Sequence, residues 1–198
     1  MTTKIYPWEY HQDLAEERLI IIARLIVDGR QTAVELQAEV EGDNGWTLGC
    51  RAFQFGRHRI LRAADNVEHP WLGLIDRGLQ LTFKIGEVPI RIYRGEADEP
   101  TDRTMRQSNN ELRQLGFSFD ERDEGRELAF RFAVETDIDG SALAVKFVGL
   151  RGATAVLNWN VPIEDIASGG AVGSAATEPV ELGAPTVGVR GRPSKTGY

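Results

Sequence analysis

The stretch 79-LQLTFKIGEVPIRIYRG-95 decides the fold, because two runs of alternating apolar and polar residues flank a short break that contains glycine. Leu81, Phe83 and Ile85 alternate with polar residues, and the alternation resumes after Gly86-Glu87. Side chains of a β-strand point to its two faces in turn, so each run predicts a half-buried strand. A Gly-X pair between two such runs predicts a hairpin with a two-residue turn.

A second region with the same pattern covers residues 127–162. The stretch 127-ELAFRFAVETDIDGSALAVKFVGL-150 holds two alternating runs around Asp139-Gly140, and 153-ATAVLNWNVP-162 follows a turn at Arg151-Gly152. Three successive strands with tight turns predict an antiparallel meander. Pro89 has no N–H to donate to a ladder, so we expect it on an edge strand or facing outward. The whole pattern predicts an antiparallel sheet of five or more strands.

Helical periodicity is clearest in 8-WEYHQDLAEERLIIIARLIVDGR-30, where apolar residues recur at i, i+3 and i+4. This predicts an amphipathic helix that ends near Gly29, with this glycine as its C-cap. Residues 31–40 fit either a helix or a strand, and their partial alternation favours a strand. A further helix over residues 46–64 is expected to bury Trp46, Cys50, Phe53, Ile60 and Ala64. A short helix over residues 101–115 is expected to begin at Thr101 and to end at Gly116.

The composition changes at Ala167. The last 32 residues contain seven Gly and three Pro and show no apolar periodicity, which predicts a disordered tail over residues 167–198. Residues 1–166 are then expected to form a single α+β domain. In it, the amphipathic N-terminal helix and the short helices pack on the antiparallel sheet.

Charge and cysteine content restrict the partners and the compartment. The net charge is −7, and the tail has two acids and three bases, so residues 1–166 carry −8. Such an acidic body does not suit a broad phosphate-binding face. The only cysteine, Cys50, excludes an internal disulfide and fits a reducing, bacterial-type cytoplasm. No apolar run approaches the roughly 20 residues of a membrane span, and no signal peptide is recognisable at the start, so we expect no membrane association.

The tail contains a basic motif, 190-RGRP-193, with a lysine two residues further on. It resembles the core of an AT-hook, a short peptide that places arginines in the narrow minor groove of A·T-rich DNA. The resemblance implies that Arg190 and Arg192 enter the groove and that Lys195 contacts phosphate. Val189 stands where such motifs often have proline, and three charges bind weakly at physiological salt. We therefore expect at most weak DNA contact through the tail.

The body contains one basic cluster, on the helix expected over residues 46–64. Its arginines are candidates for contact with nucleic acid or with an acidic partner; the alternative is a solvated helix face that pairs with carboxylates such as Glu39, Glu41 and Asp65. The cluster consists of Arg51, Arg57, Arg59 and Arg62.

A second candidate site lies at the end of a strand. Arg91, Tyr93 and Arg94 precede the acidic loop that contains Glu96, Asp98 and Glu99. Opposite charges meeting at a strand end predict either a polar pocket or a solvated rim.

Catalytic signatures are absent from the sequence: it has no G-x-S-x-G, Walker A or H-E-x-x-H motif. The three histidines lack metal-site spacing, and the acids at 135, 137 and 139 fall on an expected turn. We assign no catalytic residue, cofactor or metal, and the oligomeric state stays open. The sequence favours a non-catalytic interaction or regulatory module that binds another macromolecule, with a protein as the expected partner. The alternatives are a DNA-associated accessory protein that uses the tail and the arginine cluster, and an enzyme with a polar pocket near residues 91–99.

Overall fold

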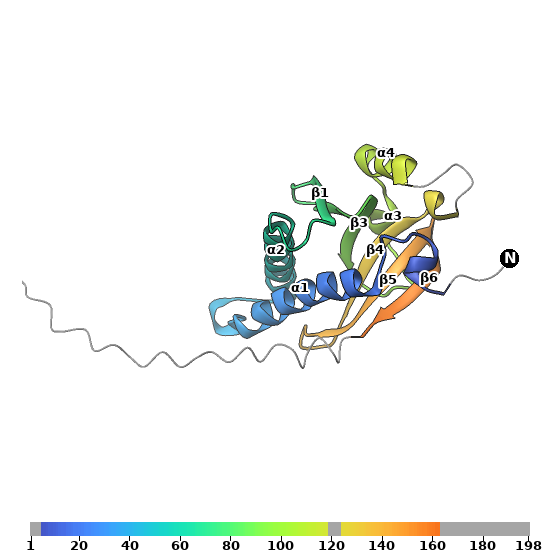
Figure 1. Ribbon diagram of the computed structural model, residues 1–198. Coiled ribbons are helices and arrows are strands. Elements are labelled where there is room, and N and C mark those ends of the chain that lie inside the picture. Colours follow the sequence, from blue (N-terminus) through green and yellow to red (C-terminus); the bar gives the residue numbers. More distant parts are fainter. Residues whose placement is uncertain (1–4, 119–123, 163–198) are drawn as a thin grey trace, which may run out of the picture.

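The computed structural model describes residues 5–118 and 124–162, which form a six-stranded sheet covered by helices (Figure 1). This confirms the expected α+β class. The helices are η1 (Pro7–Glu9), α1 (Glu16–Glu35), η2 (Glu39–Glu41), α2 (Gly45–Ala64), α3 (Asp102–Met105), α4 (Asn109–Ser118) and η3 (Glu124–Glu127). The strands are β1 (Leu72–Asp76), β2 (Thr82–Ile85), β3 (Val88–Arg94), β4 (Ala129–Thr136), β5 (Ala142–Arg151) and β6 (Thr154–Val161). The predicted tail, with Arg190, Arg192 and Lys195, lies outside the described residues.

The strands follow one another across the sheet in the order β1 to β6. Every neighbouring pair is antiparallel except β3 and β4, which are parallel. The sheet is therefore mixed, and the prediction of a purely antiparallel sheet is wrong at this one pairing. The reason is the long connection between the two strands, which contains α3 and α4. A crossover of this length returns the chain to the end of the sheet where β3 began, so β4 runs in the same direction.

The predicted hairpin is confirmed. Ile85 pairs with Val88, and Gly86 has a φ of 57° at the first turn position, where a type II′ turn requires glycine. Pro89, however, is buried in β3, which lies between β2 and β4. The ladder to β4 begins one residue later, at Ile90, so no partner strand needs an N–H from the proline. The meander of β4, β5 and β6 is also confirmed.

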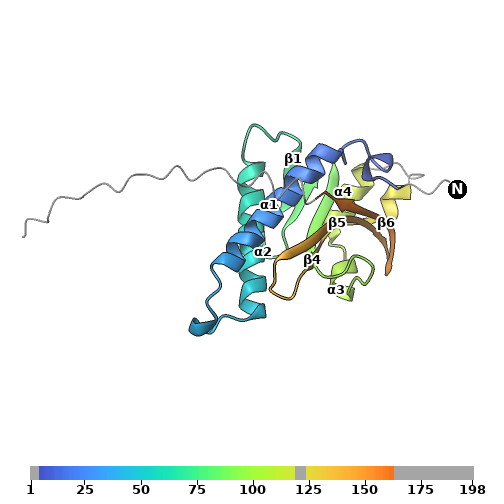
Figure 2. The same cartoon turned by 90° about the horizontal axis from the view of Figure 1, so that it is seen from below.

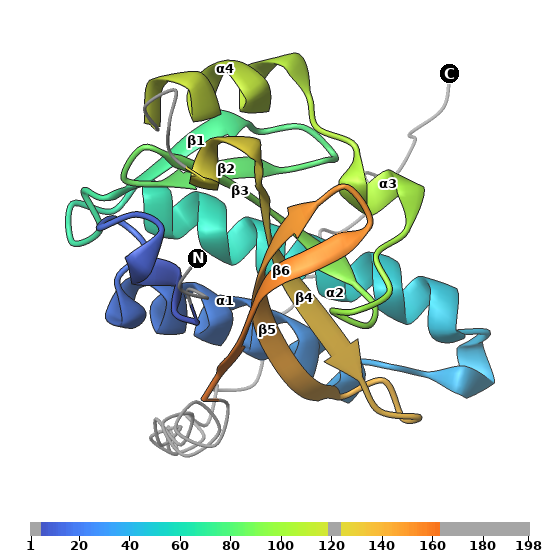
Figure 3. The ribbon, with the colours of Figure 1, turned by 90° about the vertical axis from the view of Figure 1, so that its right-hand side faces the viewer.

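Helices α1 and α2 pack against the same face of the sheet (Figures 2 and 3) and cross where two glycines meet. A Cβ on Gly29 would lie 2.5 Å from the backbone nitrogen of Gly56. Gly29 is therefore a close-packing residue inside α1 and not the predicted C-cap. The helix continues to Glu35, so the preference for a strand over residues 31–40 is wrong. The alternation of apolar residues seen in this stretch does not match the side chains that are buried. Ala33 is buried against α2, whereas Leu36 is exposed.

The buried face of α2 differs from the predicted one. Trp46 is 76% exposed and Cys50 is also exposed, although both were expected in the core. Of the predicted set, Ile60 is fully buried. The helix instead buries a row with several small residues, which allows α1 to approach closely: Leu48, Ala52, Gly56, Ile60 and Ala63.

The helix predicted over residues 101–115 is divided into α3 and α4. Thr101 caps α3 as expected, because its hydroxyl accepts a hydrogen bond from the N–H of Thr104 at 3.4 Å. Two arginines of the sheet then bind carbonyls at the end of α3: Arg131 donates to Thr104 at 3.2 Å and Arg91 to Arg106 at 3.0 Å. These bonds satisfy carbonyls that a continuous helix would use. α4 starts at Asn109 and passes through Gly116, the predicted end.

The core lies between the sheet and helices α1 and α2. Four phenylalanines form its centre, and their rings stack or meet edge to face; they are Phe83, Phe130, Phe132 and Phe147. The opposite face of the sheet carries smaller residues such as Ala129, Ala133 and Val148. This face is the one toward which Arg131 points, since its neighbours at 130 and 132 point into the main core.

Candidate binding site at the free edge of β3

A cavity of about 530 Å³ lies between α2, the end of β3 and α3. Four consecutive residues of β3, at positions 91–94, line it. Successive side chains of a strand point to opposite faces, so the cavity must pass around an edge of β3. One edge is paired with β4 up to Arg94. The other is paired with β2 only up to Ile90, so the cavity follows the part of β3 that extends beyond β2.

Five arginines line this cavity, and none of the described residues in its wall is an aspartate or a glutamate. In a chain with a net charge of −7, this is a local concentration of positive charge. Low-dielectric walls strengthen its field and attract anions. The arginines come from α1, β3, the start of α3 and β4; they are Arg30, Arg91, Arg94, Arg103 and Arg131.

Arg131 is the most deeply placed, with an exposed fraction of 1%. Its guanidinium forms an ion pair with Glu111 and donates to the carbonyl of Phe130 at 2.8 Å. Its Nη2 has no hydrogen-bond partner among the described residues. Burial lowers the pKa of Arg131, against the opposing effect of Glu111. A buried donor without a partner costs on the order of 1–3 kcal/mol, so an anion that reached Nη2 would be stabilising.

Arg30 lines the cavity from α1 and is 5% exposed. Its Nε donates to the carbonyl of Gly140 at 2.5 Å, and its Nη2 again has no partner in the described part of the chain. Burial, followed by the positive charge of Arg94, lowers the pKa of Arg30, while Asp139 opposes the shift. An anion near Arg30 and Arg94 would offset their mutual repulsion.

Two further polar groups of the wall, Arg91 and Tyr93, are held in place by hydrogen bonds to neighbouring residues. Arg91 donates to Gln80 at 3.1 Å in addition to its bond with Arg106. The hydroxyl of Tyr93 donates to the carbonyl of Glu96 at 3.2 Å. Burial, followed by the charges of Glu135 and Asp98, raises the pKa of Tyr93 to about 12. The phenol of Tyr93 therefore holds its proton more tightly than an exposed tyrosine does.

The wall also has a large apolar part. Ile26, Phe53, Ile92 and Val134 line it on the side of α1 and α2. Trp46 lies at the rim, because it lines the cavity and is 76% exposed. A ligand that fits this site would thus combine a negative charge with an apolar part, as is usual for cavities of this size.

The structure places the predicted residues Arg91, Tyr93 and Arg94 in the wall of this cavity. The acidic loop that was expected to face them does not line it. The backbone turns at Gly95, which has a φ of 147°, and Asp98 accepts a hydrogen bond from Asn158 on β6 at 2.9 Å. The cavity wall is therefore cationic, and Glu96 and Asp98 stay close to Tyr93 at the strand end without lining the cavity.

Three of the five arginines were missed in the sequence: Arg30, Arg103 and Arg131. Arg131 could have indicated the site in the sequence, because it is a long charged residue within the apolar run 129-AFRFAV-134. All six residues of this run are buried, and a charged residue in such a run must find a partner or face a cavity.

The arginine cluster of α2 mostly binds neighbouring elements. Arg51 forms an ion pair with Asp43 at 2.9 Å, Arg59 donates to the hydroxyl of Thr32 at 3.0 Å, and Arg57 donates to the carbonyl of Gly78 at 3.2 Å. Arg62 is exposed. These contacts connect α2 to α1 and to nearby loops. A role of the cluster in binding nucleic acid or a partner stays a prediction.

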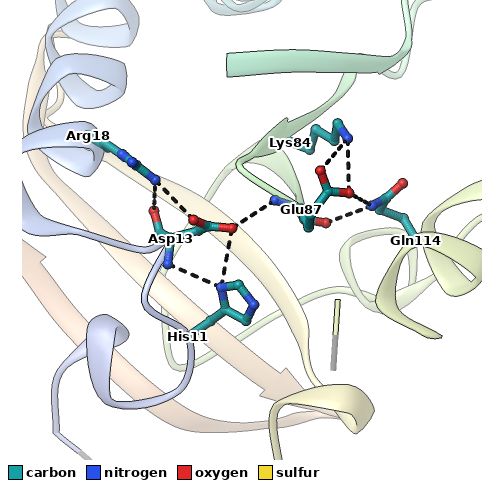
Figure 4. Close-up of polar contacts among 6 residues, drawn as sticks. All are labelled: His11, Asp13, Arg18, Lys84, Glu87 and Gln114. Carbon is teal, nitrogen blue, oxygen red and sulfur yellow. Dashed lines mark hydrogen bonds and ion pairs between the residues drawn. The ribbon is translucent and has the colours of Figure 1, made fainter. Parts of the chain in front are cut away.

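A second polar cluster lies near the β2–β3 hairpin (Figure 4). Asp13 is at its centre: it accepts hydrogen bonds from Arg18 at 3.2 Å and from the N–H of Glu87 at 3.1 Å, and its own N–H donates to His11 at 3.1 Å. Lys84 pairs with Glu87 at 3.0 Å, and Glu87 also accepts from Gln114. These contacts connect the N-terminal segment, the β2–β3 hairpin and α4.

No protein-family model matches the chain, and neither a curated protein nor a solved structure matches it. Residues 5–118 and 124–162 contain no group of three or more His, Cys, Asp or Glu side chains that could hold a metal ion. Within the same ranges, each helix is too short or too polar to cross a membrane.

Proposed function

We propose that this protein is a non-catalytic interaction module that binds an acidic segment of a partner protein in the arginine-lined cavity. The observation that carries the proposal is the wall of five arginines without a carboxylate. Two of them, Arg30 and Arg131, are buried and keep an Nη2 without a partner among the described residues. Charge-assisted hydrogen bonds from such groups are stronger than those between neutral groups.

The composition of the wall favours binding over catalysis. None of its described residues is a histidine, lysine, aspartate or glutamate, the side chains that most often transfer protons in enzymes. Thr104 and Cys50 line the cavity, but activation of a hydroxyl or thiol commonly uses an adjacent base. The exposed thiol of Cys50 fits the reducing cytoplasm, where we place the protein. DNA binding remains a separate proposal that depends on the tail motif 190-RGRP-193.

The test is a titration with inorganic phosphate, a simple oxyanion, at constant ionic strength. Arginine Nε–H resonances report binding, and we expect saturable shifts for Arg30, Arg94 and Arg131. Arg94→Glu reverses a charge at the cavity and should weaken binding by at least about tenfold, in line with the roughly 1.5–3 kcal/mol of a hydrogen bond to a charged group. Arg62→Glu is the matched control, because Arg62 is exposed on α2 and does not line the cavity. Equal losses in both variants, or no saturable shift, would refute the proposal.

A further inference from the structure

Strand β3 extends beyond its neighbour β2. Its last pair with β2 joins Ile90 to Phe83, whereas its ladder with β4 continues to Arg94. Within the described residues, no strand pairs with this edge of β3 after Ile90. The cavity lies along that edge, as the lining by residues 91–94 shows. An unpaired strand edge is a template for another extended chain.

The hairpin register shows which backbone groups face the cavity. Ile85 and Val88 flank the two-residue turn, and such flanking residues exchange hydrogen bonds. Hydrogen-bonded positions recur at every second residue, so the series on this edge continues through Ile90 to Ile92 and Arg94. The N–H and C=O groups of Ile92 and Arg94 are therefore directed toward the side that β2 leaves open. Alternating donors and acceptors of this kind match a peptide backbone better than an isolated anion.

The two faces of β3 give the cavity two chemically different lobes. On the side of α1 and α2, the wall has its main apolar part, with Ile26, Phe53 and Ile92, and it also carries Arg30 and Arg94. On the opposite side, it is polar and cationic, with Arg91 and Arg131. A chain in extended conformation directs its side chains to these two sides in turn. Apolar residues then suit the part of the first lobe around Ile92, and acidic residues suit the second lobe. Arg94 adds a positive charge at the end of the strand, which attracts the acidic chain as a whole.

Resting on the proposed function, we infer that the ligand is an extended peptide segment with alternating acidic and apolar residues, which adds as a strand to the free edge of β3. The four positions beyond Ile90 span roughly 13 Å at about 3.3 Å per residue, so four or five residues of the partner fill the site. Main-chain hydrogen bonds to Ile92 and Arg94 supply affinity, and the two lobes supply specificity.

The test uses the peptide acetyl-Glu-Val-Glu-Val-Glu-amide and two derivatives, one N-methylated at both valines and the other at the three glutamates. In an added strand, residues of one parity direct their N–H groups to β3 and residues of the other parity direct them away. We expect one methylated peptide to lose at least about tenfold in affinity, equivalent to about 1.4 kcal/mol, and the other to bind nearly as well as the parent. Arg94→Glu should weaken the parent peptide, and Arg62→Glu should not.

The outcomes separate this inference from the proposed function. Equal binding of both methylated peptides would overturn strand addition, because the protein would then make no hydrogen bonds with the peptide backbone. Absence of peptide binding together with saturable, Arg94-dependent phosphate binding would also overturn it, while anion binding in the cavity would stand. If neither probe bound in an Arg94-dependent way, both proposals would fail. A valine peptide with lysine in place of glutamate is the charge control and should not bind.

Discussion

The guanidinium of Arg131 lies against the carboxylate of Glu111, and both side chains are almost completely buried. The pair connects β4 to α4. Each partner also keeps one atom, Nη2 of Arg131 and Oε2 of Glu111, without a hydrogen bond among the described residues. A buried pair of this kind contributes little net stability, because desolvation offsets much of the attraction. Removal of only one partner, however, leaves the other as an uncompensated buried charge.

Glu111→Leu should therefore lower the free energy of unfolding by about 3–5 kcal/mol. The double variant Glu111→Leu with Arg131→Met removes both charges, so it should be more stable than Glu111→Leu alone. Urea unfolding of the two single variants and the double variant measures this coupling. If the two losses simply added, the buried charge would not be the cause of the instability.

The crossing of α1 and α2 depends on the absence of a side chain at Gly29. In Gly29→Ala, the new Cβ would lie 2.5 Å from the nitrogen and 2.8 Å from the Cα of Gly56, both rigid backbone atoms. We expect a loss of about 1–3 kcal/mol from overpacking, larger than the gain of about 1 kcal/mol in helix propensity.

Gly45→Ala is the matched control for Gly29→Ala, since Gly45 is also helical and a Cβ there meets nothing within 4 Å. It should leave the free energy of unfolding unchanged or slightly higher. A loss in both variants of similar size would contradict the close-packing argument.

Asp13 and Gly86 depend on one another at the β2–β3 turn. A Cβ on Gly86 would lie 2.1 Å from Oδ2 of Asp13, and Gly86 also has a positive φ of 57°. Asp13→Ala should cost about 0.5–1.5 kcal/mol, because it removes the acceptor for the exposed N–H of Glu87. In Gly86→Ala, both the clash and the backbone strain are destabilising. The double variant should lose less than the sum of the two, since the clash disappears with the carboxylate; thermal unfolding of all four proteins tests this.

Local chemistry explains why the β-hairpins were predictable. Alternation and turn residues are encoded within a few neighbouring positions. The turn at Gly86 requires a positive φ at this residue, and a glycine in the sequence is enough to indicate it. Gly29 shows the opposite case, because a glycine after an aspartate fits a helix end as well as a close crossing. Only the position of Gly56 on another helix decides between the two.

The cavity was predictable only in part. Arg91, Tyr93 and Arg94 are neighbours in sequence, so their grouping at a strand end could be seen in advance. The contributions of Arg30 and Arg131 depend on tertiary structure, namely the crossover that makes β4 parallel to β3 and the packing of α1. Sequence patterns also do not give the relative lengths of β2 and β3, and this difference creates the free edge.

The last prediction concerns alkaline pH. The pKa of Tyr93 is raised from 10 to about 12 by burial, then by the charges of Glu135 and Asp98. The folded protein therefore holds this proton more tightly than the unfolded chain, whose tyrosines ionise near pH 10. The resulting stability is fully present below the unfolded pKa and is lost as the pH rises from 10 to 12. Tyr93→Phe removes this titration, so its free energy of unfolding should fall less over that range than that of the unmodified protein. The tyrosinate absorbance of the unmodified protein should contain a late-ionising component that is missing in Tyr93→Phe; identical titration curves would show that Tyr93 ionises like an exposed phenol.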